Sequence, residues 1–478
     1  MLKKLWHSAS AMTWAALAVR LGGFAILLPL VLAYFSANEV TLWLLFSAIA
    51  SFQLVADFGF GQTFSREIAY GFVGRSLVDS HDSSLNQSSA IKENFLKPNW
   101  NSIQSAITVM SWLYLRFALL SLLLFGLFGT WAAFIPIENS DYPYLAWVSW
   151  IVVLFSTVIS IYGTLYSTFL VGANRIDLQK RWETIVGCIS LSAQVIVLIA
   201  GGGLLGLVLA AQLGLIIQIL VNRSLCIHIS DGQFKKNDDK NLDRRLLKAM
   251  WPAAWRTAIG SIVGIGMTRG MAIAMANLLV AAEAAPVLLA LRVIQTISQI
   301  SNVPFYTKIP EFNRIRASKK IRLLSEKSSK FMQLSLFLYV IGAIMIDLIA
   351  RQFLAFVGSE TQFPDHLFWS TLVLAIFAER FGAMHIQLLL TSNKAIAHIA
   401  NGISGVICII SMFVLFPVIG VMAVPLSLLI ANIGFYSWYT VIPTLQSISG
   451  ISYFKYEARV ALIPIILLIS WIIYITKF

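Results

Sequence analysis

Long apolar stretches separated by short polar connections make up most of the chain. A helix needs about 17 or more mostly apolar residues to cross the hydrocarbon core of a bilayer. Stretches that meet this criterion lie near 10–35, 40–60, 107–135, 145–170, 183–200, 205–227, 250–280, 286–308, 331–356, 366–390, 396–418, 421–442 and 459–476. The pattern predicts an all-α polytopic membrane protein with twelve transmembrane helices and a thirteenth at the C-terminus.

Charge in the connections alternates from one to the next. Basic residues gather at Lys3 and Lys4 and within 66–97, 175–181, 223–248 and 308–330. The connections between them contain acids and no bases, namely Glu39, Glu138, Asp141, Glu283, Glu360 and Asp365. Because basic loops stay in the cytoplasm, we predict a cytoplasmic N-terminus, and an external C-terminus if 459–476 spans. No small-residue cleavage site follows Lys4, so the first apolar run is interpreted as a span and not a signal peptide.

A hydrophilic connection halfway along the chain predicts two lobes. We expect an N-terminal six-helix bundle over 1–230 that includes a cytoplasmic connector at 62–104, and a cytoplasmic inter-lobe loop at 231–249. A C-terminal six-helix bundle would cover 250–442, and 443–478 would be an extension with an extra span. Both bundles would start from the cytoplasm, which makes the repeat a parallel one.

The connector at 62–104 leaves two interpretations open. Ile91, Phe95, Trp100 and Ile103 are spaced for a short interfacial helix that Pro98 interrupts. The simpler alternative is a solvated connector without a function of its own.

Composition excludes a soluble enzyme. Hydrophobic residues make up 58% and charged residues only 12%, with a mean hydropathy of +0.79, so most of the surface must face lipid. The net charge of +13 comes mostly from basic loops between spans, which argues against nucleic acid as a partner. Cys188, Cys226 and Cys408 lack the spacing of a disulfide framework or metal site. Without an HExxH, P-loop or nucleophile-elbow motif, we expect no cofactor and no enzymatic activity.

Seven arginines lie within the predicted spans, where a charge costs about 2.5–3.5 kcal/mol to insert. Arg351 follows Asp347 by four residues, so those two are expected to pair. The remaining arginines predict a cationic cavity that binds an anion, because the planar guanidinium binds phosphate oxygens with two parallel hydrogen bonds. The predicted anion-binding residues are Arg20, Arg116, Arg256, Arg269, Arg292 and Arg380.

Polar side chains at helical spacing predict the lining of that cavity. Gln295, Gln299, Asn302 and Tyr306 follow Arg292 on one face of their helix, and Gln387 shares a face with Arg380. A second stripe of Ser149, Ser156, Ser160, Thr164 and Ser167 fits helix packing as well as a lumen. Gly260, Gly264, Gly266 and Gly270 are expected to serve close packing or bending.

Four titratable residues at membrane depth are candidates for coupling transport to a proton gradient: Asp57, Asp347, Glu379 and His385. Each has a simpler interpretation. Asp347 and Glu379 would neutralise nearby arginines, and His385 would be a buried, hydrogen-bonded core residue.

Two short segments resemble one family of transporters. Residues 57–62, Asp-Phe-Gly-Phe-Gly-Gln, are followed by Arg66 and resemble a segment of O-antigen-type, Wzx-like polysaccharide flippases. These belong to the multidrug/oligosaccharidyl-lipid/polysaccharide (MOP) exporter superfamily. Residues 170–175, Leu-Val-Gly-Ala-Asn-Arg, are similar to a turn of the same family. The long connector and the thirteenth span depart from a family with twelve or fourteen spans.

The resemblance implies two six-helix bundles around a central cationic cavity that works by alternating access. The cargo would be an undecaprenyl-diphosphate-linked oligosaccharide, moved from the cytoplasmic to the outer leaflet of a bacterial inner membrane for O-antigen and lipopolysaccharide synthesis. Membrane lipid and polysaccharide polymerases or ligases would be the partners. Two alternatives stay open: a cation-coupled multidrug antiporter of the same superfamily, and a non-transporting membrane scaffold. A cationic cargo calls for membrane carboxylates, and here arginines outnumber them.

Overall fold

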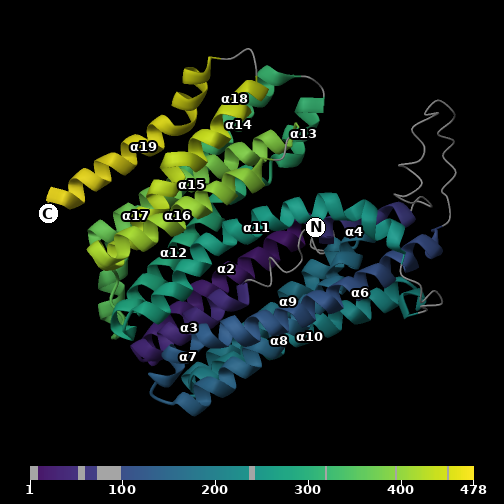
Figure 1. Ribbon diagram of the computed structural model, residues 1–478, viewed down its shortest axis with the longest axis horizontal. Coiled ribbons are helices and arrows are strands. Elements are labelled where there is room, and N and C mark those ends of the chain that lie inside the picture. Colours follow the sequence, from purple (N-terminus) through teal and green to yellow (C-terminus); the bar gives the residue numbers. More distant parts are fainter. Residues whose placement is uncertain are drawn as a thin grey trace. The chain divides into compact units, whose positions relative to one another are not determined.

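The computed structural model describes residues 9–51, 60–72, 98–235, 243–317, 320–392, 396–448 and 452–477. Within those ranges the chain is helical apart from short connections and contains no strand (Figure 1). Ten helical stretches of the described residues are long and apolar enough to cross a membrane. The prediction of an all-α polytopic membrane protein is therefore confirmed.

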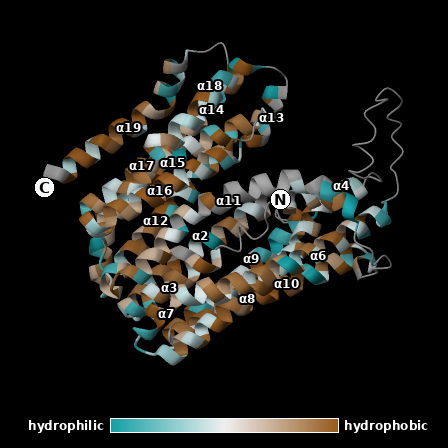
Figure 2. Ribbon diagram, viewed as in Figure 1, coloured by the Kyte–Doolittle hydropathy of each residue, from teal (hydrophilic) through white to brown (hydrophobic). Residues whose placement is uncertain are grey.

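The predicted spans agree with the helices closely. One 51-residue stretch, Ala397–Ser447, contains two predicted spans, and the chain breaks it at Gly420 with a φ of 55°. The second predicted span contains α3 (Ala37–Ala50), which is apolar but only 14 residues long. The seventh, near 250–280, overlaps α11 (Arg244–Leu278), and the helix ends two residues before the predicted span does. Hydrophilic residues collect toward the ends of the helices (Figure 2).

Contacts divide the chain into two compact units, Met1–Ala258 and Ile259–Phe478, with the division inside α11. The other helices of the first unit, besides α3, are α2 (Ala9–Tyr34), α4 (Phe60–Phe72), α6 (Trp100–Leu124), α7 (Thr130–Glu138), α8 (Pro143–Gly172), α9 (Ile176–Ile199) and α10 (Gly203–Ile229). Those of the second are α12 (Ala281–Tyr306), α13 (Ile309–Ala317), α14 (Ile321–Val357), α15 (His366–Leu390), α16 (Ala397–Ile419), α17 (Ala423–Ala431), α18 (Ser437–Ser447) and α19 (Tyr453–Lys477).

The same sequence of helix pairings occurs in both units. In the first unit α4 packs on α6 and α8, α6 packs on α8, and α10 packs on α8 and α9. In the second, α12 packs on α14 and α15, α14 packs on α15, and α17 packs on α15 and α16. The two units thus share one pattern of helix–helix contacts, which supports the parallel repeat expected from the sequence.

The connector predicted at 62–104 is wrong at its start. Residues 60–72 form α4, and its Phe60, Phe64 and Ile68 are fully buried against α6 and α8. The helix is strongly amphipathic, so its polar residues hid a core-facing stripe from a hydropathy argument. Glu67 is also buried, and its Oε1 accepts a hydrogen bond of 3.0 Å from Ser102 Oγ.

The predicted interfacial helix around Pro98 is also wrong where the structure describes it. Asn99 caps the N-terminus of α6 through a 3.2 Å hydrogen bond from the Ser102 amide, so the proline precedes a helix and does not interrupt one. Ile103 is fully buried in the core of the first unit. The proposed positions 91 and 95 lie outside the described residues.

Short connections are fixed by residues at the helix ends. Ser36 and Glu39 form a capping box at the start of α3, and Asp365 accepts from the Phe368 amide at the start of α15. Gly358, with a φ of 71°, ends α14 in the left-handed conformation that glycine adopts without strain. These caps let consecutive helices reverse direction within a few residues.

Candidate functional site

Helix α15 is the central helix of the second unit. Four side chains from its neighbours donate hydrogen bonds of 3.0 Å to its backbone carbonyls: Tyr339 to Val373, Asn432 to Ala375, Ser437 to Ala378, and Thr444 to His385. Gly382 permits close contact, since a Cβ there would lie 2.8 Å from the Tyr436 ring. The helix that holds Glu379, Arg380, His385 and Gln387 is therefore firmly positioned.

Arg380 connects α15 to α12 at Ser298, which lies between the stripe residues Gln295 and Gln299. Its Nη1 donates to Ser298 Oγ at 3.1 Å and to the Ser298 carbonyl at 3.4 Å. Ser298 is buried, and the guanidinium makes no other hydrogen bond to the described residues. Arg380 is thus anchored by a neutral partner through one of its three nitrogens, which leaves Nε and Nη2 as donors for a ligand.

The polar stripe of α12 contains enclosed oxygen atoms without a donor. Arg292, Gln295 and Asn302 are half-buried, whereas Gln299 and Tyr306 are exposed. The side-chain oxygens of Gln295, Asn302 and, on α15, Gln387 are enclosed yet accept no hydrogen bond within the described part of the chain. An enclosed amide oxygen without a donor costs about 1–3 kcal/mol, so these atoms suit a ligand that supplies hydroxyl groups.

The six predicted anion-binding arginines are divided between the units. Arg269, Arg292 and Arg380 belong to the second unit and are half-buried. Arg20 and Arg116 belong to the first and are exposed; Arg116 stacks 3.5 Å above the Trp112 ring. The Arg256 side chain and all of Asp57 lie outside the described residues. Of the six arginines, Arg292 lies on α12 itself, and Arg380 is bonded to α12 through Ser298.

Asp347 forms a buried charge cluster at the opposite end of α14 from Lys327. Its Oδ1 lies 3.1 Å from Arg351 Nη1, so the predicted ion pair is confirmed. His366 adds a partner that the sequence did not indicate, with Nδ1 at 3.0 Å from the same oxygen. Arg351 also donates from Nη2 to the Pro364 carbonyl at 2.6 Å. The cluster ties the end of α14 to the start of α15.

His385 is fully buried and both of its ring nitrogens have partners. Nδ1 lies 2.8 Å from the Phe381 carbonyl oxygen, and Nε2 lies 3.1 Å from Glu457 Oε1. His385 is therefore buried and hydrogen-bonded, as the simpler interpretation expects, and its coupling role stays a prediction. The sequence analysis missed Glu457, although it is a lone acid in the first turns of the last apolar helix, α19.

The second segment that carries the family resemblance packs on α4, the helix that begins within the first segment. Gly172, in the second segment, closes on α4, which begins within the first. A Cβ on Gly172 would lie 2.7 Å from the Ile68 side chain and 2.8 Å from the Ser65 carbonyl oxygen. Asn174 then adopts a φ of 57°, and the Arg175 amide donates to the Leu170 carbonyl at 2.9 Å. Only glycine allows this approach of α8 to α4.

The serine stripe of α8 serves packing. Ser149 and Ser156 are buried and donate to carbonyls one turn earlier on their own helix. Ser156 also lies 2.8 Å from Gln212 Oε1 on α10. Of the two interpretations left open, helix packing is the one these contacts favour.

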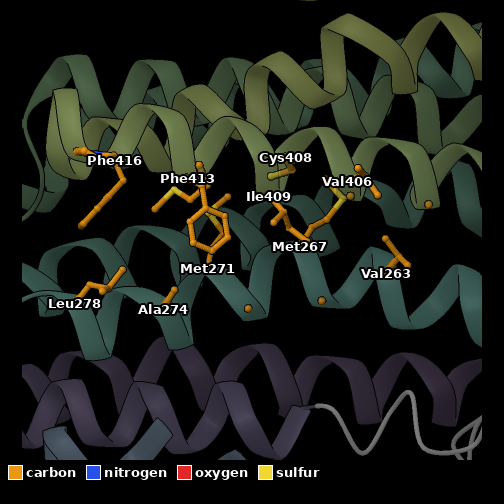
Figure 3. A pocket seen from close by; sticks show the side chains of 16 residues that line it. Val263, Met267, Met271, Ala274, Leu278, Val406, Cys408, Ile409, Phe413 and Phe416 are labelled. Carbon is orange, nitrogen blue, oxygen red and sulfur yellow. The ribbon is translucent and has the colours of Figure 1, made fainter.

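An apolar groove of about 630 Å³ lies between α11 and α16 in the second unit (Figure 3). Its lining includes Met267, Met271, Ile409 and Phe413, and no charged side chain. A Cβ at Gly266 or Gly270 would meet nothing within 4 Å, so the predicted close packing is wrong at these two positions. The groove can hold hydrocarbon and is unsuited to an anion.

Comparison with known proteins gives structural matches only. No family model matches the sequence, and no curated protein does. An inward-facing multidrug resistance MATE family transporter of the MOP superfamily superposes with a TM-score of 0.63 at 11% identity, over 92% of this chain and 100% of that one.

Two further matches have other functions in their descriptions. A MOP superfamily transporter from Pyrococcus furiosus, described as having a binding pocket of reverse polarity, gives a TM-score of 0.51 at 13% identity, over 95% of this chain and 98% of that one. The lipid II flippase MurJ, in an inward closed conformation, gives a TM-score of 0.50 at 13% identity, over 95% of this chain and 97% of that one.

The class of protein follows from fold and composition together: this is a multi-pass membrane protein with the fold of a transporter. More particularly, the fold is that of MOP superfamily transporters, among which both multidrug transporters and a lipid flippase occur. At these identities the likeness shows the fold alone.

Proposed function

We propose that the protein is a flippase for an anionic, lipid-linked oligosaccharide of the undecaprenyl diphosphate type. It would move this cargo from the cytoplasmic to the outer leaflet of a bacterial inner membrane by alternating access, with its N-terminus in the cytoplasm. The product would supply surface polysaccharide synthesis, including O-antigen, with polymerases or ligases as partners.

The observation that carries this proposal is the position of Arg380. The residue lies near the middle of α15, a helix long and apolar enough to cross a membrane, and its only hydrogen-bond partner among the described residues is Ser298. In a spanning helix this position is far from both membrane surfaces. A guanidinium held by a neutral hydroxyl keeps its full charge and two donor nitrogens for an anion. A diphosphate offers oxygens for paired hydrogen bonds with this geometry.

The other parts of the cargo have matching chemistry in the second unit. Sugar hydroxyls can donate to the enclosed oxygens of Gln295, Asn302 and Gln387. The apolar groove between α11 and α16 has the lining that a hydrocarbon tail requires. Arg269 and Arg292, together with Arg20, Arg116 and Arg256 of the first unit, would bind the diphosphate at successive stages of the passage.

The alternative function is a cation-coupled multidrug antiporter, which the match at a TM-score of 0.63 favours. A cationic drug calls for carboxylates that are available to it. Asp347 is already occupied by Arg351 and His366, and Glu457 by His385. Glu379, a further described carboxylate near the middle of a span, lies next to Arg380 on α15. The use of Asp347 and Glu457 by other side chains favours the anionic cargo.

Ligand binding to the purified protein distinguishes the two functions. Undecaprenyl diphosphate should bind more tightly than undecaprenyl monophosphate, and the uncharged alcohol should bind weakest. Arg380→Ala should weaken diphosphate binding, whereas Arg322→Ala, at a position 91% exposed, should not. Binding of a cationic dye together with equal, weak binding of all three lipids would overturn the proposal in favour of the antiporter.

A further inference from the structure

The contact between His385 and Glu457 requires a proton. The Phe381 carbonyl can only accept a hydrogen bond, so the Nδ1 atom of His385, 2.8 Å away, must carry a hydrogen. The other nitrogen, Nε2, lies 3.1 Å from Glu457 Oε1. Two bare acceptors would repel at this distance. One proton therefore lies between them, either on the carboxyl group beside a neutral imidazole or on an imidazolium beside a carboxylate.

We propose that His385 and Glu457 form a proton-binding site between α15 and α19 that couples transport to a proton gradient. The site holds one proton and has no net charge when loaded. Release of that proton to water leaves a neutral imidazole facing a carboxylate, which abolishes the hydrogen bond and favours separation of the two helices. The coupling role rests on the proposed transport function; the proton site itself does not.

Burial makes the unloaded state costly. His385 is fully buried, and the Glu457 side chain is 24% exposed. The second carboxylate oxygen, Oε2, is enclosed and accepts no hydrogen bond within the described part of the chain. A carboxylate with one enclosed, unsatisfied oxygen is poorly stabilised, so the proposal places release of the proton in a conformation in which α15 and α19 have rearranged.

Few other charged or titratable groups face the pair. On α19 the Tyr456 ring lies 6.4 Å from the His385 ring, and its hydroxyl is 2.9 Å from Ser328 Oγ on α14. On α19 itself, Lys455 and Arg459 lie two residues before and after Glu457, and both are exposed. On α15 and the elements packed around it, the other groups are Glu379 and Arg380 of α15, Lys327 of α14 paired with Glu311 of α13, Arg316 of α13 bonded to Ser447, Arg322, Glu326, Lys330 and Tyr339 of α14, Tyr436, and Tyr439 of α18. Within the described part of the chain, none of these groups makes a hydrogen bond, ion pair or ring contact with His385 or Glu457, apart from the Tyr456 ring, so we assign the exchange of protons to the pair itself.

This site gives the additional helix a function. Helix α19 packs along α14 and against α15, and its first turns supply Glu457 to a buried histidine. Arg380 lies five residues before His385, about 7.5 Å along the axis at 1.5 Å per residue, and Gln387 lies two residues after it. A shift of α15 that follows proton release would therefore move the proposed cargo-binding residues on the same rigid helix.

The test uses Glu457→Gln and His385→Gln in the full-length protein, with Glu326→Gln as control. Glu326 is 54% exposed on α14 and contacts neither residue of the pair. Acid-minus-alkaline infrared difference spectra of the purified protein, recorded without cargo, report the shared proton. Because one proton belongs to both groups, each variant should lose the same carboxyl and histidine bands, and the control should keep them. In liposomes, an imposed pH gradient should accelerate lipid flipping in the wild type and control but not in either variant.

The two measurements separate the coupling site from the cargo. Wild-type bands in both variants would overturn the proton site, and a wild-type gradient response in both variants would overturn the coupling. If the wild type flips no diphosphate-linked lipid under any gradient, the proposed transport function is wrong. The infrared spectra would still show whether His385 and Glu457 share a proton. Glutamine is close in shape to glutamate, so Glu457→Gln should fold. If either Glu457→Gln or His385→Gln fails to fold, the other variant gives both measurements.

Discussion

His366, in the first turn of α15, places its Nδ1 3.0 Å from Oδ1 of Asp347 on α14. His385, nineteen residues further along the same helix, places its Nε2 3.1 Å from Oε1 of Glu457 on α19. At 1.5 Å per residue the two histidine–carboxylate contacts are about 28 Å apart, close to the thickness of the hydrocarbon core. One helix thus has a titratable contact at each end and Arg380 between them.

Asp347→Asn should destabilise the second unit. The Asp347 side chain is 1% exposed and accepts from both Arg351 and His366, so the amide would lose the charge that holds two partners together. We expect a loss of about 1–3 kcal/mol in the free energy of unfolding, measured with denaturant in detergent. Glu326→Gln, which breaks only an exposed pair, should change it by less than about 0.5 kcal/mol. Equal stability of the two variants would show that Asp347 does not tie α14 to α15.

Gly172→Ala and Gly266→Ala should act in opposite directions. A methyl group at Gly172 would lie 2.7 Å from the Ile68 side chain and 2.8 Å from a backbone carbonyl, which cannot give way easily. We expect a loss of about 1–3 kcal/mol there. At Gly266 nothing lies within 4 Å, so alanine should be neutral or stabilise by up to about 1 kcal/mol through helix propensity. A stable Gly172→Ala variant would contradict the close approach of α4 to α8.

The sequence contained enough information for the helices but not for contacts between distant segments. The apolar stretches predict the spans because each must cover a fixed thickness of hydrocarbon. Asp347 and Arg351 could be paired because a spacing of four residues places them on one helix face. The partner of His385 lies 72 residues away on another helix, and no local pattern connects the two.

Predictions from the sequence were also wrong for an amphipathic helix and for two helical glycines. Helix α4 buries one face and carries Ser65, Arg66 and Glu67, so its average hydropathy resembles that of a loop. Glycines at helical spacing suggest close packing, yet Gly266 and Gly270 line an open groove while Gly172 makes the tight contact. Which glycine is crowded depends on where the neighbouring helix lies, and that is a tertiary property.

Stability should depend on Glu311 at acid pH. Hydrogen bonds from Lys327 and then Lys308 hold the pKa of the Glu311 carboxyl below its ordinary value of 4.5. A lowered folded-state pKa contributes stability that is present above 4.5 and is lost as pH falls through the lower value. The thermal midpoint of the wild type should therefore approach that of Glu311→Gln as pH falls below about 4.5. Because the pair is solvent-exposed, 1 M salt should reduce the difference, and a difference that grows on acidification would contradict the assignment.

Orientation in the membrane can be tested with reporter fusions. Basic loops remain in the cytoplasm, so fusions after Lys248 and after Lys330 should both report a cytoplasmic location. Fusions near Glu138 and Glu283 should report the external side, since those connections contain acids and no bases. A fusion at the C-terminus should report the external side if α19 spans. An external signal after Lys330 would overturn both the orientation and the two-lobe layout.

Arg380 and Arg292 provide the sharpest test of the anionic cargo. If both bind a diphosphate, Ala at either position should stop glycan export while the protein still accumulates in the membrane. A charge-assisted contact is worth about 1.5–3 kcal/mol, so its loss should weaken the affinity for the diphosphate by roughly tenfold to a hundredfold. Lys should restore export only in part, because an ammonium keeps the charge but loses the paired hydrogen bonds.

The measurement is export divided by membrane protein level in Arg380→Ala, Arg380→Lys, Arg292→Ala and Arg292→Lys. Arg322→Ala serves as the matched control, because Arg322 is 91% exposed and any effect of removing a positive charge alone appears there as well. A structural role would lower abundance and leave export per molecule unchanged, since Arg380 would then matter only for its bonds to Ser298. Full export per molecule in both alanine variants would exclude these arginines from cargo binding.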